Sequence, residues 1–213
     1  MATLNYLLDT YNARGQKSPI KVYNSRNVSL TKLFRKLGFT TGAEIGVARG
    51  YFSRVLCQRV PNLKLYCIDA WEPWFGATHG ESKHKFEKIY IDAQHRLAPY
   101  NCEIIRDWSN SAVKRFENGS LDFVYIDCSH DYKSVTEDIQ KWSKKVRKGG
   151  IVSGHDYITP KKLLEKLPQY SSRDYNKTNY DVKRAVNDWV KKKKIKKLFI
   201  FTKDLAPSWF YVK

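Results

Sequence analysis

Short apolar runs alternate with amphipathic stretches through most of the chain, and this alternation constrains the fold more than any other feature. The apolar runs are, in chain order, AEIGV, KLYCIDAW, CEIIRDW, LDFVYID and GGIVSGHDY. The stretches between them, such as YFSRVLCQRV, HKFEKIYIDAQHRL and SVTEDIQKWSKKVRK, have helical spacing of apolar residues. Strands and helices that take turns predict parallel strands with right-handed crossovers, which is a doubly wound α/β sheet.

The two ends of the chain are expected to add different elements to this sheet. Near residue 213, KLFIFT and SWFYVK are two apolar runs joined by a short turn that contains Pro207, which predicts an antiparallel hairpin at the sheet edge. The result is a Rossmann-like sheet of seven mostly parallel strands. Residues 1–38 hold two helical pieces, 4–12 and 30–37, and we expect an N-terminal brace or lid on one domain that spans 39–213.

The charge of the chain bears on its partners. The 39 Lys and Arg residues outnumber the 21 Asp and Glu residues, for a formal net charge of +18 that attracts anions. Nucleic acid is therefore one candidate partner. It is not favoured, because the charge is spread along the chain and no known nucleic-acid-binding module is present.

Cysteine spacing and hydropathy predict the compartment. The four cysteines lie far apart without a CxxC pair, as expected for small core residues in a reducing compartment. The first residues lack a signal-peptide pattern, and the sequence holds no run of about 18 apolar residues. We expect a cytoplasmic protein that does not enter a membrane.

A glycine turn follows the first predicted strand, in GAEIGVARGYFS. A strand that runs through a glycine turn into a helix is the usual geometry for a nucleotide-like ligand, although the glycines could also serve packing only. A dinucleotide fingerprint would need glycines where this chain has Ala48 and Tyr51. The motif E-x-G-x-x-x-G instead resembles the cofactor loop of class I S-adenosylmethionine-dependent methyltransferases. This resemblance implies that Gly46 and Gly50 approach the methionyl half of the cofactor, and that Glu44 organises its ammonium end directly or through water.

Residues after the next two strands are candidates for the rest of such a cofactor. Asp69 ends the second strand, where a carboxylate can accept both ribose hydroxyls, and a helix cap is the alternative. Trp71 could wall the pocket or simply cover the sheet edge. After the third strand, where methyltransferases of this architecture present residues to adenine, Asp107 could accept from the exocyclic amine and Trp108 could pack on the base. The following Ser109 or Asn110 could cap a helix.

Acids and histidines gather after the fourth and fifth strands. Asp127 ends LDFVYID, and His155 and Asp156 end GGIVSGHDY, so three potential ligands converge at one edge. The pattern ID-x-x-H-x-Y, V-x-x-D, a helix with Trp142, then R-K-GG-x-x-x-GHDY resembles the macrocin O-methyltransferase and cephalosporin-hydroxylase-like branch, of methyltransferase family 24 type. The resemblance covers roughly residues 40–213.

This branch implies roles for the cluster. Asp127 and Asp156 would ligate a divalent metal that orients the acceptor hydroxyl, which makes Asp127 catalytic, and His130 would be the general base. Asp127 is also a candidate cofactor-binding residue, because it faces the same cleft as Gly46 and Asp69. Position 155 is often acidic in metal-using relatives, and the His155 found here as a third candidate ligand favours Mn²⁺ or a metal-free enzyme over Mg²⁺. For His130, the alternative is a histidine that caps the following helix.

The sequence therefore predicts an S-adenosylmethionine-dependent methyltransferase domain at 39–213. The expected reaction is O-methylation of a sugar or small polyhydroxylated metabolite, with Mg²⁺ or Mn²⁺ assistance. Two alternatives stay open: an RNA methyltransferase with a basic surface, and a non-catalytic cofactor-binding protein. Segments 72–85 and 159–180 are candidate substrate loops, and a homodimer is left open.

Overall fold

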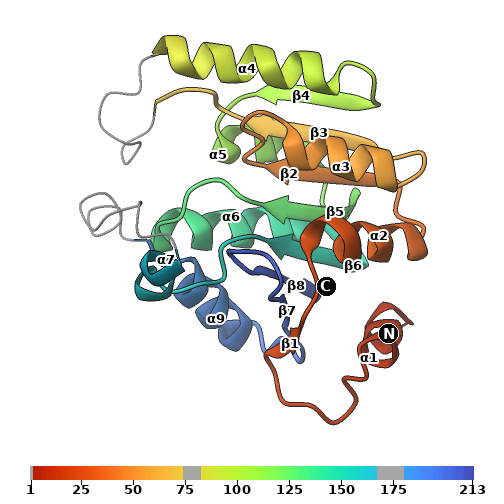
Figure 1. The fold of residues 1–213 in the computed structure, drawn as a ribbon. Coiled ribbons are helices and arrows are strands. Elements are labelled where there is room, and N and C mark those ends of the chain that lie inside the picture. The colour runs from red at the N-terminus through yellow and green to blue at the C-terminus, as the bar shows by residue number, and fades with distance from the viewer. Residues whose placement is uncertain (1, 74–82, 167–179) are drawn as a thin grey trace.

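The computed structural model describes residues 2–73, 83–166 and 180–213, and these form a layered α/β fold around an eight-stranded sheet (Figure 1). The strand order is β1-β7-β8-β6-β5-β2-β3-β4. Strand β8 runs antiparallel to both of its neighbours, and all other pairs are parallel. The strands are β1 (Ile20–Val22), β2 (Thr41–Ile45), β3 (Lys64–Asp69), β4 (Cys102–Arg106), β5 (Leu121–Ile126), β6 (Val146–Gly154), β7 (Phe199–Phe201) and β8 (Ser208–Val212).

Helices cover both faces of the sheet, as a doubly wound topology requires (Figure 1). One face packs against α5 (Ser109–Ala112), η2 (Val113–Arg115), α6 (Tyr132–Lys145), α7 (Pro160–Lys166) and α9 (Val182–Lys192). The other packs against α1 (Ala2–Thr10), η1 (Arg26–Leu30), α2 (Thr31–Lys36), α3 (Tyr51–Arg59) and α4 (Lys83–Leu97). Each helix buries its apolar stripe on the sheet, so two cores form, one on each face.

The sheet has one strand more than the seven predicted. Strand β1 comes from the segment between the two N-terminal helices, and it pairs in parallel with β7 at the sheet edge. It is three residues long, follows Pro19 and exposes Lys21, which are typical features of an edge strand and give little sequence signal. The N-terminal segment thus joins the main sheet, and its role as a brace or lid stays a prediction.

The carboxyl ends of the central parallel strands meet at one edge of the sheet. The loops after β2, β3, β4, β5 and β6 all lie there, which is where open α/β sheets bind ligands. Of the candidate substrate loops, residues 74–82 and 167–179 lie outside the described residues. Among the helices that are described, none is long and apolar enough to span a membrane.

Candidate active site

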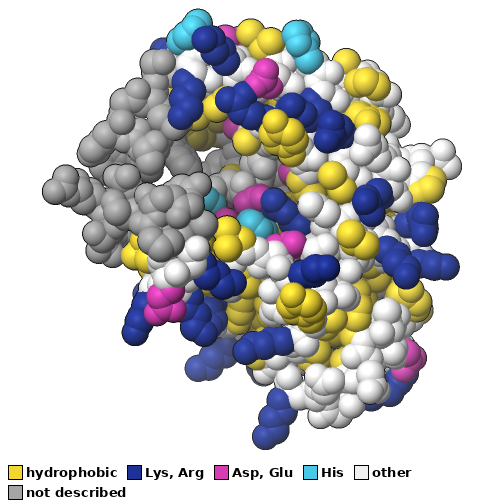
Figure 2. All heavy atoms as spheres, in the orientation of Figure 1, with side chains coloured by type: hydrophobic (Ala, Val, Ile, Leu, Met, Phe, Trp, Pro, Cys, Tyr) yellow, Lys and Arg dark blue, Asp and Glu magenta, His cyan; other side chains and the backbone are white. Residues whose placement is uncertain are grey.

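A cavity of about 600 Å³ lies at the carboxyl edge of β2, β3, β4 and β5. Its volume is within the range of small-molecule and cofactor sites, about 300–1,000 Å³. Figure 2 shows this side of the molecule hollowed near its middle, with acidic, basic and histidine side chains around the hollow. Five of the predicted cofactor residues line the cavity: Gly46, Asp69, Asp107, Trp108 and Asp127.

The glycine loop is built so that two strands can approach closely. Gly46 has φ +91°, and a Cβ at this position would collide with the backbone carbonyl of Asp127. Gly50, at φ +75°, is the N-cap of α3 and does not line the cavity. Of the two predicted glycines, only Gly46 therefore lies where it can face a cofactor.

The carboxylate of Asp69 holds the glycine loop in place. One oxygen accepts hydrogen bonds from the amides of Val47 at 3.0 Å and Ala48 at 2.9 Å, and the other accepts from the amide of Trp71 at 2.9 Å. A carboxylate offers about four acceptor positions, so one remains for a ligand hydroxyl. Ribose binding by Asp69 stays a prediction, and a bidentate contact would require it to release a loop amide.

Trp71 lies beneath this loop and not in the lining of the cavity. Its side chain is 1% exposed, its indole N–H donates to the carbonyl of Ala48 at 2.9 Å, and its ring packs on Tyr90. The backbone of Trp71 has φ +46°, in the left-handed region. The prediction that Trp71 walls the pocket is thus replaced by a supporting position under the loop.

Glu44 is also buried away from the cavity. It is 2% exposed and accepts a hydrogen bond of 2.5 Å from the hydroxyl of Ser53 on α3. Burial raises the pKa of Glu44 to about 8, against the opposing effect of the Ser53 hydrogen bond, and the charge of Asp127 raises it further. Glu44 is not among the described residues that line the cavity, and its role at the ammonium end of a cofactor, directly or through water, stays a prediction.

The raised pKa of Glu44 predicts a pH dependence of stability. Between pH 4.5 and about 8 the folded protein holds a proton that the unfolded chain releases, so the free energy of unfolding falls as pH rises. The expected slope is on the order of 1 kcal/mol per pH unit. Urea unfolding at several pH values should show a steeper slope in the wild type and in the exposed-site control Glu117→Gln than in Glu44→Gln, which keeps only the slope from other groups with a raised pKa, such as His130 and Asp138. An equal slope in all three proteins would contradict the assignment.

The residues after β4 form the end of the cavity predicted to face adenine. Trp108 is 51% exposed and free to pack on a ring, while the carboxylate of Asp107 accepts from the amide of Trp108 and from Arg115. Ser109 does not cap α5 with its side chain. The hydroxyl of Ser109 donates to the buried carboxylate of Asp138 and accepts from the indole N–H of Trp142. Ser109 thereby supports the wall of the cavity.

Asp138 was not assigned a role from the sequence, although it is the acid of the V-x-x-D pattern. It lines the cavity, is 4% exposed, and accepts hydrogen bonds from Ser109 and from the thiol of Cys128 at 3.0 Å. Burial raises the pKa of its carboxyl, against both hydrogen bonds. A buried acid on the apolar face of a predicted helix was the signal that could have identified it.

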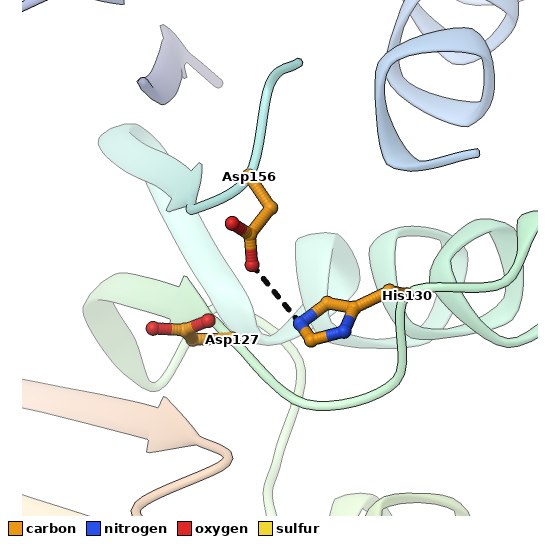
Figure 3. A group of neighbouring side chains, drawn as sticks. All are labelled: Asp127, His130 and Asp156. Carbon is orange, nitrogen blue, oxygen red and sulfur yellow. Dashed lines mark ion pairs between the residues drawn. The ribbon is translucent and has the colours of Figure 1, made fainter. Parts of the chain in front are cut away.

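The acid and histidine cluster adjoins the large cavity through Asp127, which lines both that cavity and a small pocket beside it. His130 Nε2 lies 2.9 Å from Asp156 Oδ2 (Figure 3). His155 Nδ1 lies 3.2 Å from Asp156 Oδ1 and 3.7 Å from Asp127 Oδ1. Asp156 has φ +60°, an unfavourable backbone region that a non-glycine residue seldom occupies without a structural or functional reason.

The charges in this cluster compensate one another. Burial alone would lower the pKa of His130, but the hydrogen bond to Asp156 and the charges of Asp156, Asp127 and Asp131 outweigh it and raise the pKa. Burial would raise the pKa of Asp156, but hydrogen bonds from His130 and His155 hold it well below its usual range. Asp156 is therefore an anion that orients His130 and favours its protonated form.

Arg26 is a site residue that sequence reasoning missed. It comes from η1, donates to Asp127 Oδ2 at 2.9 Å and to the hydroxyl of Tyr125 at 3.0 Å, and stacks 4.9 Å from the centre of the Phe52 ring. Its amide also donates to Asp204. No motif marks Arg26, because its position depends on the pairing of β1 with β7.

The side chains that could hold a cation differ from those predicted. In the part of the chain that the structure describes, the group whose ligand atoms lie within 4.8 Å of one another is Asp127, His130 and Asp156. His155 is not in this group, although its Nδ1 lies 3.7 Å from Asp127 Oδ1 and 3.2 Å from Asp156 Oδ1. Two carboxylates and an imidazole fit Mn²⁺ better than Mg²⁺. Arg26 occupies Asp127 Oδ2 and leaves Oδ1 for a cation.

Comparisons with solved structures show the same fold in proteins of low sequence identity. An O-methyltransferase from Bacillus cereus in complex with SAH has a TM-score of 0.62 and 16% identity, covering 100% of this chain and 91% of that chain. A putative caffeoyl-CoA O-methyltransferase from Staphylococcus aureus has a TM-score of 0.63 and 15% identity, covering 100% of both chains. TomG from Streptomyces achromogenes, an O-methyltransferase involved in tomaymycin synthesis and solved with SAM, has a TM-score of 0.63 and 15% identity, covering 99% and 89%.

Sequence comparisons show the family of the chain, whereas the solved structures show only its fold. The search of curated proteins gives no significant match. A family model described as a methyltransferase domain matches residues 43–157, which run from β2 to just beyond Asp156. The matched region includes the glycine loop, the cavity lining and the acid and histidine cluster. Since it covers more than half of the sequence, the chain belongs to the methyltransferase domain family.

Proposed function

We propose that the protein transfers the methyl group of S-adenosylmethionine to a hydroxyl oxygen of a small molecule. One observation carries the proposal: the cofactor-sized cavity adjoins the His130–Asp156 pair at Asp127, which lines both. Similar folds bind SAM or SAH in the O-methyltransferases of Bacillus cereus and Streptomyces achromogenes. In the proposed complex the cofactor lies over Gly46 and Asp69, with Trp108 beside its base.

The reaction is an in-line displacement. The acceptor oxygen forms a bond to the methyl carbon as the carbon–sulfur bond breaks, and the sulfonium becomes the neutral thioether of S-adenosylhomocysteine. The acceptor hydroxyl loses its proton to His130, and the second product is a methyl ether. Holding the two reactants in line supplies much of the rate, and removing the proton supplies a further factor of about 10²–10⁴.

The pair with Asp156 decides which nitrogen of His130 acts. An ionised carboxylate only accepts hydrogen bonds, so Nε2 of His130 carries the proton that points at Asp156. In the neutral ring this leaves Nδ1 as the atom that accepts the proton of the acceptor hydroxyl. Asp156 is then a positioning residue that fixes the tautomer and stabilises the charged ring.

The acceptor we propose is a hydroxyl of a sugar or a small polyhydroxylated metabolite. Support comes from the resemblance of the ID-x-x-H-x-Y and GHDY motifs to sugar O-methyltransferases. The small pocket lined by His130, His155 and Asp156 has a volume of only about 10 Å³, so the acceptor would bind in the large cavity at Asp127, whose carboxylate can accept hydrogen bonds from hydroxyls.

A divalent cation at this cluster is the alternative to proton transfer to His130. Asp127, His130 and Asp156 would hold it, and it would orient the acceptor hydroxyl and lower its pKa. In that arrangement the ring of His130 would hold the cation, so His130 would not be the proton acceptor. The two arrangements therefore give different results when metal is removed.

We expect Mn²⁺ to bind the wild type and to bind Asp156→Asn more than about tenfold more weakly, because an anionic ligand is lost. Calorimetric titration measures this, with Asp9→Asn, on the exposed face of α1, as the control that keeps wild-type affinity. Turnover after EDTA treatment is the second readout. If EDTA leaves turnover unchanged and Mn²⁺ gives no heat, the cation is removed from the mechanism while methyl transfer stands.

The reaction itself is tested with S-adenosylmethionine that carries a labelled methyl group. The protein is incubated with a panel of sugars, glycosides and polyols, and label transfer is followed by mass spectrometry. Transfer to a hydroxyl of one panel member is the expected result. Transfer to RNA with none to small molecules would instead support the nucleic-acid alternative, with binding that weakens steeply as salt rises.

A further inference from the structure

A second cavity of about 600 Å³ lies at the opposite edge of the sheet, where α6, α9 and β8 end. Helix α6 begins beside His130, and its last turn lines this cavity. The rise from Tyr132 to Lys144 along the helix is about 18 Å at 1.5 Å per residue. No residue lines both this cavity and the one at Asp127 among those that the structure describes. It is a separate place on the molecule, and methyl transfer does not use it.

The floor of this second cavity is apolar. Trp189 and Tyr211 are 6% and 3% exposed, and the indole N–H of Trp189 donates to the hydroxyl of Tyr211 at 2.8 Å. Their polar atoms are thus paired with each other, so the rings offer mainly carbon to the cavity. Leu4, Ile195 and Val212, all partly buried, complete the apolar lining. Binding of an apolar group in this cavity is therefore favourable, because its apolar surface is removed from water.

The rim carries a concentrated positive charge. Six lysines line the cavity: Lys144, Lys193, Lys194, Lys196, Lys197 and Lys213. No Asp or Glu is among the described lining residues, and none of the six lysines forms an ion pair with a carboxylate in the described ranges. Like charges held together around a concave apolar surface repel one another, and an anion in the cavity relieves that repulsion.

We propose that this cavity binds a small amphiphilic anion, with an apolar body on Trp189 and Tyr211 and a phosphate monoester or similar dianionic group among the lysines. The cavity is partly open to solvent, and its volume of about 600 Å³ fits a small molecule. Nucleic acid is less well suited, because the two aromatic rings are too buried to stack with bases. A bilayer is also less well suited, since it binds protruding apolar surfaces and not a recess.

The test uses octyl phosphate as the probe, with octyl glucoside as the neutral-headed control and inorganic phosphate as the tail-free control. Calorimetry on the full chain should show one octyl phosphate site and much weaker binding of both controls. The triple variant Lys144→Gln, Lys193→Gln and Lys196→Gln should bind octyl phosphate about tenfold more weakly, as expected for three exposed ion pairs. The matched variant Lys32→Gln, Lys36→Gln and Lys88→Gln removes three exposed lysines elsewhere and should bind like the wild type.

Three outcomes would overturn the proposal. Equal binding of octyl phosphate and octyl glucoside would show that the lysines do not recognise charge. Equal loss in the two triple variants would show a general effect of net charge and not a site. Binding of anionic vesicles or of an RNA oligonucleotide, with none of octyl phosphate, would assign the surface to a macromolecule.

Discussion

Replacing His130 with alanine should lower kcat by about 10²–10⁴-fold, the contribution typical of a positioned general base. The affinity for S-adenosylhomocysteine should change little, because His130 lines the small pocket and not the large cavity. Label transfer to the acceptor measures the first quantity and calorimetry the second. His95→Ala, an exposed histidine on α4, is the matched control and should keep wild-type turnover.

The pH profile separates a proton acceptor from a residue that only supports the structure. Since Asp156 raises the pKa of His130, turnover should rise with pH through a value above 6.5 as the ring becomes neutral. Asp156→Asn removes that charge, so the rising limb should move to lower pH while kcat falls. Turnover that persists across neutral pH in His130→Ala would remove the base from the mechanism.

Replacing Gly46 with alanine should have the largest effect on the cofactor site. The new Cβ would collide with the carbonyl of Asp127, and φ +91° is strained for any side chain. Strained backbone and overpacking together cost about 2–5 kcal/mol. Either the loop or Asp127 must move, so binding of S-adenosylhomocysteine should be lost as well. Urea unfolding and calorimetry measure the two effects.

Gly38 supplies the control for this variant. It also has a positive φ, +67°, but a Cβ there meets no atom within 4 Å. Gly38→Ala therefore carries only the cost of the backbone conformation, about 1–2 kcal/mol, and leaves the cofactor loop intact. If the two variants lose the same stability and both retain binding, the close approach of β2 and β5 at Gly46 does not shape the site.

The sequence predicted the edge at which the site forms better than it predicted side-chain directions. Parallel strands end at a common edge, so Gly46, Asp69 and Asp127 were expected to meet, and they line one cavity. Glu44 is one residue before the end of β2, where alternation points its side chain toward α3 and Ser53. Trp71 is buried under the glycine loop, a position that no spacing rule indicates.

In the acid and histidine cluster, too, the sequence predicted the location but not the side-chain directions. Two motifs on neighbouring strands brought His130, His155 and Asp156 to one place, but which histidine completes a set with the acids depends on the direction of each ring. Arg26 was not identified from the sequence, because it lies in η1, directly after the edge strand β1 that was not predicted. Contacts that depend on an unpredicted strand pairing carry no local signal.

Titration of S-adenosylhomocysteine into the wild-type protein tests the central claim most directly. The proposal predicts one site with a Kd in the micromolar range, about −8 kcal/mol, which is lost in Gly46→Ala and kept in His130→Ala. Absence of binding at high micromolar concentrations of a folded protein would contradict the assignment of the cavity to this cofactor, and with it the proposed methyl transfer.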